Sequence, residues 1–142
     1  SLFEALNQLD YYQQNFPKSL GREWIDTYFL PLLKSSQLSA EDQLSTVVEH
    51  IAFQISKSTA AIPPTQMLIT GGGAYNQFLV SRIKEISQHD IQLPSDQIIS
   101  FKEAIVFAFL GTLRFFNQIN CLRSVTAASE DSSVGEVHQP NK

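Results

Sequence analysis

Cysteine is nearly absent from this sequence, whose 142 residues include a single one, Cys121. A lone cysteine excludes an internal disulfide framework and is typical of a protein from a reducing compartment. The three histidines are scattered, so no Cys/His cluster has metal-ligand spacing, and we expect no metal site in this chain. No Ser or Asp arrangement accompanies them, which argues against a catalytic triad. Cys121 is expected to be a small buried side chain rather than a nucleophile.

A basic excess and long apolar runs are also missing. The chain carries 10 basic and 14 acidic side chains, for a net charge of −4, and no basic patch stands out. The longest strongly apolar run, Ala104 to Leu113, is too short to cross a membrane. No signal peptide is visible at the start. We therefore expect neither nucleic acid nor a membrane as a partner.

Glycine is scarce, but three of the six glycines are consecutive, at positions 71 to 73. They follow a short apolar run that ends at Thr70 and precede Asn76, where a helical pattern begins. Glycines directly after a strand let another backbone or a ligand approach closely and allow positive φ at low cost. The N–H groups and positive dipole end of the following helix point to the same place. Two interpretations remain open: a loop for a nucleotide or another anion, or a tight turn with Asn76 as helix cap.

Hydrophobic periodicity predicts mainly helices. Pro17 should end the first helix, and Pro31 should bend or break the second. Ser39 should cap the third, with His50 on its surface. The last helix is apolar on most faces, so we expect it to be central and well buried. The predicted helices are 2–14, 22–33, 40–59, 76–87 and 102–117, and the predicted extended segments are 66–70, 91–94 and 98–99.

These elements predict one domain, residues 1–128, followed by a polar tail, residues 129–142, which we expect to be loose. The apolar run at 66–70 suits a parallel strand covered on both faces, but the chain offers few neighbours for it. We therefore predict a helix-rich α/β fold that is part of a larger protein whose other strands lie upstream. The alternative is a mostly helical domain with a small edge sheet.

Two further segments carry polar side chains suited to a site. Glu103 stands in the first turn of the last predicted helix, where the helix dipole favours a carboxylate; the alternative is a hydrogen-bond acceptor for a polar substrate. In the segment from Pro17 to Glu23, Lys18 and Arg22 could meet an anion. The plainer alternative, which we favour, is an ordered loop held by an ion pair between Arg22 and a carboxylate.

Four segments, taken in order, resemble the C-terminal part of anhydro-N-acetylmuramic acid kinases, a family of the sugar kinase/Hsp70/actin superfamily. The resemblance spans nearly all of the chain, and the combination is much more specific than any one segment. The segments are P-K-S-L-G-R-E at 17–23, T-G-G-G-A-Y-N at 70–76, K-E-A-I-V-F-A-F-L at 102–110 and N-C-L-R-S-V-T at 120–126.

The resemblance implies an ATP- and Mg²⁺-dependent kinase of murein recycling in the bacterial cytoplasm. Such enzymes phosphorylate 1,6-anhydro-N-acetylmuramic acid while water opens the anhydro bridge, which gives N-acetylmuramic acid 6-phosphate. The implied fold is two ribonuclease-H-like (actin-like ATPase) domains that close on the ligands. Gly71, Gly72 and Gly73 match the family's adenosine-side glycine motif, with Asn76 expected at the ATP as well, and Glu103 matches a glutamate on the sugar side.

The resemblance also implies that the catalytic groups lie outside this chain. The family's aspartate general base and phosphate-binding loops precede the matched region, so we expect no catalytic residue here and no activity from this chain alone. A missing N-terminal part of the same protein and a homodimer are the implied protein partners. The family's T-G-A motif reads Thr126-Ala127-Ala128 here. This departure keeps open a non-catalytic or degenerate nucleotide- or protein-binding module, and another sugar kinase of the superfamily is a further alternative.

Overall fold

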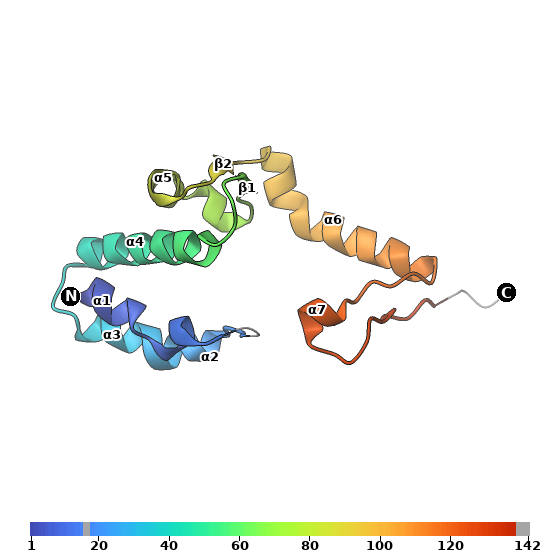
Figure 1. Cartoon of the computed structure of the whole chain (residues 1–142), viewed down its shortest axis with the longest axis horizontal. Coiled ribbons are helices and arrows are strands. Elements are labelled where there is room, and N and C mark those ends of the chain that lie inside the picture. The colour runs from blue at the N-terminus through green and yellow to red at the C-terminus, as the bar shows by residue number, and fades with distance from the viewer. Residues whose placement is uncertain (16–17, 139–142) are drawn as a thin grey trace. The chain divides into compact units, whose positions relative to one another are not determined.

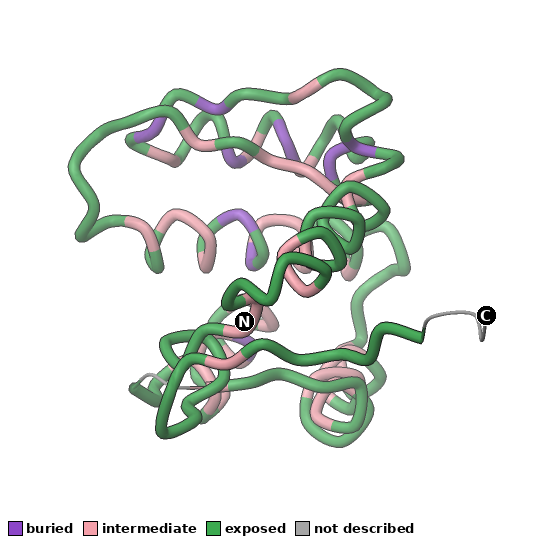
Figure 2. The backbone as a smooth tube through the Cα atoms, turned by 90° about the vertical axis from the view of Figure 1, so that its right-hand side faces the viewer, coloured by how far each residue is buried: buried purple, intermediate pink, exposed green. Residues whose placement is uncertain are grey.

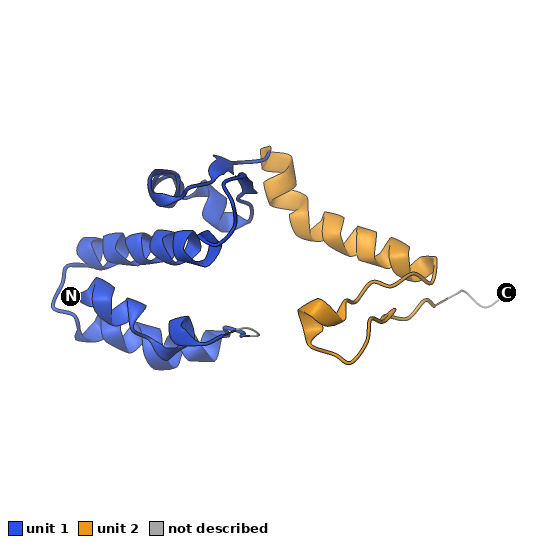
Figure 3. Cartoon of the chain, viewed as in Figure 1, with its two compact units in different colours: residues 1–94 blue, residues 95–142 orange. Residues whose placement is uncertain are grey.

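The computed structural model describes residues 1–15 and 18–138 and is rich in helix (Figure 1). The sheet that it describes has two parallel strands, β1 (Gln66–Leu68) and β2 (Asp90–Gln92), paired in register from Gln66 with Asp90 to Leu68 with Gln92. The chain divides into two compact units, residues 1–94 and 95–142 (Figure 3). None of the described helices is long and apolar enough to cross a membrane. The helix-rich α/β class predicted from the sequence is therefore confirmed.

The first predicted helix is two short helices. Helix α1 (Leu2–Asn7) begins with a capping box, in which Ser1 Oγ accepts from the Glu4 N–H at 3.3 Å. The extended backbone of Leu9 then separates it from the 3₁₀ helix η1 (Asp10–Gln13). The single helix predicted over 2–14 is thus wrong, because the backbone leaves the helical conformation at Leu9. The break brings the Tyr12 hydroxyl within hydrogen-bond distance of His50. Pro17, the predicted stop, lies outside the described residues.

Pro31 does not break the second helix. The helical backbone runs without interruption through α2 (Arg22–Trp24), the π-helical turn η2 (Ile25–Phe29) and α3 (Leu30–Ser35). Proline has no N–H to donate to the carbonyl four residues earlier, and the wider π turn directly before it accommodates that loss.

The core of the first unit lies between α4 (Ala40–Thr59), α5 (Gln77–Ile86) and one face of the sheet. Ser39 caps α4 as predicted, since its Oγ accepts from the Asp42 N–H at 3.1 Å. Side chains alternate along β1: Met67 and Ile69 pack on the core, while Leu68 is 59% exposed. Within this chain one face of β1 is therefore exposed, and cover for that face from a larger protein stays a prediction. The cluster consists of Ala52, Ile83 and Ile91, with Ile55, Met67, Ile69 and Leu79 packed against it.

The last long helix, α6 (Asp96–Phe115), differs from its prediction in two ways. It begins six residues before Lys102, so Ile98 and Ile99 are helical rather than extended. Its start follows from Ser95, whose extended backbone directly after Pro94 sets the N-cap, and from Asp96 in the first turn. The helix is also not well buried, since Ile99 is its one buried residue. Figure 2 colours the backbone by burial and shows that exposed segments predominate.

The C-terminal segment is held by hydrogen bonds through residue 135. After α7 (Arg123–Thr126), Ser132 forms an antiparallel bridge with Cys121. The Asn120 side chain donates to the Val134 carbonyl at 3.0 Å and accepts from the Val134 N–H at 2.8 Å. The start of the polar tail is therefore ordered rather than loose. Cys121 is half-buried, and residues 139–142 lie outside the described part of the chain.

Candidate functional site

The three consecutive glycines form a tight connection between β1 and α5. Pairing continues one residue beyond β1, where the Ile69 N–H donates to the Gln92 carbonyl at 3.0 Å. The chain then turns at Gly71, and a 3₁₀ helix, η3 (Gly72–Tyr75), leads into α5. The Ala74 N–H donates to the Gly71 carbonyl at 3.0 Å, and Ala74 is buried. The loop is thus a closed turn anchored by one small apolar side chain.

Only one of the three glycines is required by this backbone. Gly71 has φ 82° and ψ 179°, a conformation that side chains with a Cβ rarely adopt. Gly72 has no positive φ, and a Cβ placed on it would meet nothing within 4 Å. A Cβ on Gly73 would make an ordinary contact with Leu79, at 4.0 Å. Gly72 and Gly73 therefore leave open space at an exposed turn that the fold itself does not need.

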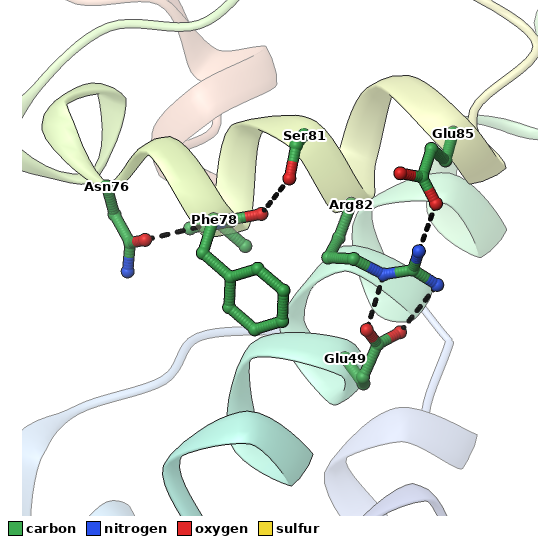
Figure 4. Close-up of polar contacts among 7 residues, drawn as sticks. Glu49, Asn76, Phe78, Ser81, Arg82 and Glu85 are labelled. Atoms are coloured by element: carbon green, nitrogen blue, oxygen red, sulfur yellow. Dashed lines mark hydrogen bonds and ion pairs between the residues drawn. The ribbon is translucent and has the colours of Figure 1, made fainter. Parts of the chain in front are cut away.

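Asn76 is the N-cap of α5, as one of the two sequence interpretations predicted. Its Oδ1 accepts from the Leu79 N–H at 3.0 Å (Figure 4), while its backbone carbonyl accepts from the Val80 N–H at 3.0 Å. This role satisfies a helix N–H that would otherwise lack a partner. It accounts for Asn76 without a ligand, and contact between Asn76 and ATP stays a prediction.

Thr70, directly before the glycines, is a feature that the sequence did not indicate. Its Oγ1 is buried and has no hydrogen-bond partner among the residues that the structure describes. A buried hydroxyl without a partner costs roughly 1–3 kcal/mol. No sequence signal would have found this, because a threonine at the end of a strand is ordinary. The hydroxyl is free to serve a partner group from outside the described residues.

Helix α5, which carries the loop at its N-terminal end, is tied to α4 by a group of charged side chains (Figure 4). Arg82 of α5 contacts Glu49 of α4 through Nε and donates from Nη2 to Glu49 Oε2 at 3.1 Å. It also pairs with Glu85 one turn later. The hydrogen bond that Arg82 donates to the Glu49 carboxylate raises the pKa of Arg82. These contacts set the position of α5, and hence of the loop, against α4.

Glu103 belongs to the second unit, whereas the glycines and Asn76 belong to the first. It is exposed and is the eighth residue of α6, not a first-turn residue. The stabilisation by the helix dipole suggested from the sequence is therefore wrong, since that effect is confined to the first turn. Its role as an acceptor for a polar substrate stays a prediction.

The segment from Lys18 to Glu23 has the plainer of its two predicted roles. Arg22 Nε pairs with Asp26 one turn later, at 3.0 Å. Lys18 Nζ donates to the Tyr11 carbonyl at 3.0 Å and lies 4.7 Å from the centre of the Tyr11 ring. Both cations have internal partners, so nothing in this segment indicates an anion site.

A buried polar network around His50 was missed by the sequence analysis, which placed this residue on the surface. His50 is 1% exposed. Its Nδ1 lies 3.0 Å from Asn7 Oδ1, and its Nε2 lies 2.9 Å from Tyr12 Oη. Asn7 Oδ1 also accepts from Gln54 at 2.6 Å, so it is an acceptor and His50 carries its proton on Nδ1. Burial lowers the pKa of His50 to about 4 and raises that of Tyr12.

The network has no place in a catalytic triad, because its members are a histidine, two amides and a phenol, all satisfied by one another. Nor does the described part of the chain contain a group of three or more His, Cys, Asp or Glu side chains that could hold a metal ion. The glycine turn remains the candidate site that the described geometry supports best.

Comparison with known proteins agrees with the motifs. A family model described as anhydro-N-acetylmuramic acid kinase matches residues 1–140. The anhydro-N-acetylmuramic acid kinase of Sulfurovum sp. (strain NBC37-1) is 33% identical over 96% of this chain and 39% of its own length. The kinase of Synechococcus elongatus is 34% identical over 93% of this chain and 37% of its own length. The kinase of Vibrio vulnificus (strain YJ016) is 31% identical over 97% of this chain and 39% of its own length. The chain spans about two-fifths of the length of these curated relatives, and it belongs to the anhydro-N-acetylmuramic acid kinase family.

Proposed function

We propose that this chain is the adenosine-binding, C-terminal part of a longer actin-like kinase that phosphorylates 1,6-anhydro-N-acetylmuramic acid with ATP. The product would be N-acetylmuramic acid 6-phosphate, formed in murein recycling in the bacterial cytoplasm. The observation that carries the proposal is the space at Gly72 and Gly73, where the fold tolerates a Cβ and the sequence still has none. A ligand that lies against the backbone at this turn gives a reason for both glycines.

Each site residue then has a separate task. Gly71 makes the turn, and Gly72 and Gly73 let adenosine lie against the backbone. Asn76 holds the start of α5 and so fixes the loop. Glu103 accepts a hydrogen bond from the sugar. The unpartnered Thr70 hydroxyl beside the loop is consistent with a site that is completed by a further group.

We assign the phosphoryl transfer itself to the additional polypeptide that the longer relatives have and this chain does not. Phosphoryl transfer depends on positioning and on neutralisation of charge. The described residues include no group of three or more His, Cys, Asp or Glu side chains that could hold a metal ion, and we place the Mg²⁺ ligands and the aspartate general base in the missing part. The isolated chain is therefore expected to have no kinase activity.

The alternative of a degenerate, non-catalytic module rests on two features, the catalytic motifs that this chain does not contain and Ala127 in place of glycine. Ala127 adopts φ 57° and ψ 21°, the left-handed conformation in which glycine is favoured. The turn is thus retained with alanine, so the substitution gives no reason to prefer a degenerate module over a kinase.

The test is a coupled ADP-release assay on the complete product of the gene that encodes this chain. Turnover with 1,6-anhydro-N-acetylmuramic acid and not with N-acetylglucosamine is the expected result. Gly72→Val should fold normally, because its Cβ has room, and should raise the KM for ATP at least tenfold. Gly21→Val is not a suitable comparison, since a Cβ there would lie 2.7 Å from Glu23; Ser45→Val, on the exposed surface of α4, serves as the control.

Two results would contradict this proposal. Turnover of N-acetylglucosamine in place of the anhydro sugar would identify another sugar kinase. An unchanged KM for ATP in Gly72→Val would remove the glycine turn from the nucleotide site.

A further inference from the structure

Helix α5 packs on α4 through an apolar face that by itself constrains the helix only weakly along its axis. Ile83 of α5 is 1% exposed and belongs to the same core cluster as Ala52 of α4, which is fully buried. Burial of apolar surface is non-directional, and Ala52 presents only a methyl group to its neighbours. Directional contacts are therefore needed to fix where α5 lies along α4.

Two polar links between the helices supply that constraint. Near the C-terminal end of α5, Ser56 Oγ donates to the Ile86 carbonyl at 2.9 Å. Nearer the glycine turn, Arg82 meets both carboxylate oxygens of Glu49, since its Nε contacts Oε1 and its Nη2 donates to Oε2 at 3.1 Å (Figure 4). Glu49 and Ser56 are seven residues apart, or about two turns, and hence lie on the same side of α4. The Glu49–Arg82 pair is thus the link that lies closer to the turn.

This pair is suited to hold a position. A guanidinium bound to two carboxylate oxygens is fixed in direction as well as in distance. The side chains of Arg82 and Glu49 are 27% and 33% exposed, so solvent screens them less than a fully exposed pair. Arg82 also pairs with Glu85, whose side chain is 60% exposed. Because Glu85 belongs to α5 itself, that contact cannot fix α5 against α4.

The position of Arg82 is transmitted to the glycine turn through the first turns of α5. Arg82 lies six residues after Asn76, about 9 Å along the helix axis. Asn76 is bound to the helix twice, since its side chain accepts from the Leu79 N–H and its carbonyl accepts from the Val80 N–H, each at 3.0 Å. The Asn76 N–H donates in turn to the Gly73 carbonyl at 3.1 Å. A shift of Arg82 along α4 therefore moves the turn with it.

We propose that the Glu49–Arg82 pair holds the glycine turn in the position that ATP requires, which makes both side chains positioning residues for nucleotide binding. This inference rests on the proposed function, in which adenosine lies against Gly72 and Gly73. The pair acts through the helix and has no contact with the ligand. A displacement on the order of 1 Å is enough to weaken binding or catalysis. Loss of the pair should weaken ATP binding and leave the sugar side, to which Glu103 is assigned, unchanged.

Three substitutions separate positioning from plain stabilisation. Glu49→Gln and Arg82→Lys each remove the two-point contact, because an amide has one acceptor oxygen and an ammonium has no planar fork. Each should raise the dissociation constant for ATP about three- to tenfold. Glu85→Gln is the matched control, since it removes the other carboxylate from Arg82 without touching α4, and it should change the constant less than about twofold. In Glu49→Gln, Arg82 keeps Glu85 as an ionic partner, so this variant is expected to fold.

The experiment uses the complete product of the gene that encodes this chain, with ATP titrated by calorimetry and turnover measured with the anhydro sugar. The expected result in Glu49→Gln is a raised dissociation constant and a raised KM for ATP. Its kcat and its KM for the sugar should stay within about twofold of the wild type. Loss of folded protein alone would instead lower the apparent kcat and leave both KM values unchanged. Thermal unfolding gives a temperature at which every variant is folded.

A second measurement shows whether the pair acts through the turn. In Gly72→Val the nucleotide no longer lies against the turn, so the addition of Glu49→Gln should change the ATP dissociation constant less than about twofold. An unchanged constant in Glu49→Gln alone overturns the inference. A loss equal to that in Glu85→Gln also overturns it, as does a loss that adds fully to that of Gly72→Val.

These outcomes are separate from those of the kinase assay. If the complete protein binds ATP with the expected pattern but does not phosphorylate the anhydro sugar, the positioning role stands and the proposed substrate fails. If it phosphorylates the sugar, and Gly72→Val raises the KM for ATP while Glu49→Gln does not, the reverse holds. Absence of ATP binding by the complete protein overturns both.

Discussion

The imidazole of His50 donates from Nδ1 to Oδ1 of Asn7, a residue 43 positions earlier in the chain, over 3.0 Å. This bond joins α4 to α1 inside the first unit, and the hydroxyl of Tyr12 meets the opposite nitrogen at 2.9 Å. These two hydrogen bonds hold only while the His50 ring is neutral. In the neutral ring Nε2 accepts a hydrogen bond from the Tyr12 hydroxyl, whereas in the protonated ring Nε2 also carries a hydrogen and can no longer accept. The fold of the N-terminal helices is therefore coupled to pH.

Acid should destabilise the chain through His50. Burial lowers its pKa in the folded state to about 4, from about 6.5 in the unfolded chain. The unfolded state binds the proton more readily, so this contribution is fully present above about pH 6.5 and is lost as the pH falls to about 4, by roughly 3 kcal/mol. Urea unfolding at pH 7.5, 5.5 and 4.5 measures it. His50→Gln should flatten the dependence, whereas His138→Gln, at a side chain 86% exposed, should not.

Alanine scanning of the glycine turn should separate folding from ligand binding. Gly71→Ala should cost about 1–2 kcal/mol of stability, because φ 82° is strained for any residue with a Cβ. Gly72→Ala should change the unfolding free energy by less than about 0.5 kcal/mol, since its Cβ meets nothing within 4 Å. Urea denaturation of the two variants side by side is the measurement. Equal losses would mean that the fold requires both glycines, and the case for a ligand at Gly72 would disappear.

Asn76 should contribute to stability through its cap. Asn76→Ala removes the acceptor for the Leu79 N–H and should cost about 1 kcal/mol. Asn76→Asp retains the acceptor and adds a favourable charge at the helix start, so it should be close to the wild type or more stable. Thermal unfolding followed by circular dichroism gives the comparison. A loss in Asn76→Asp equal to that in Asn76→Ala would show that the amide group, not the oxygen, matters.

Ala127→Gly should stabilise the chain. Ala127 is held at φ 57° at the end of α7, where a Cβ is unfavourable by about 1 kcal/mol and glycine is the common residue. Part of that gain is offset by the greater freedom of glycine in the unfolded chain, so an increase of up to about 1 kcal/mol in the unfolding free energy is expected. Ala128→Gly is the control, because Ala128 has no positive φ. A decrease in Ala127→Gly would contradict the prediction.

Local features were predictable from the sequence, because they depend on residues a few positions apart. The caps at Ser39 and Asn76 follow from one side chain and the N–H three residues later. The order of helix, strand, glycine turn and helix follows from hydrophobic spacing in the same way. The four motifs were also sufficient for the family, since their combination is specific even where each motif is weak.

The start of α6 was less predictable. Lys102 and Glu103 resemble a helix beginning, but Ser95 and Asp96 provide an N-cap position and an acidic first turn six residues earlier. A helix starts at the first suitable site that its neighbours allow, and apolar residues such as Ile98 are compatible with either helix or strand when taken alone. The sequence pattern therefore left the boundary ambiguous.

The sequence alone determined the family, the caps and the presence of a glycine turn between β1 and α5. Only the tertiary structure decided that His50 is buried, because Asn7 and Tyr12 reach it from segments that are distant in the chain. It also decided what each glycine is for. Gly71 serves the turn through its positive φ, while Gly72 and Gly111 face open space. The physical reason is that a missing side chain acquires meaning only from what surrounds it, and those surroundings are set by packing between elements rather than by neighbours in sequence.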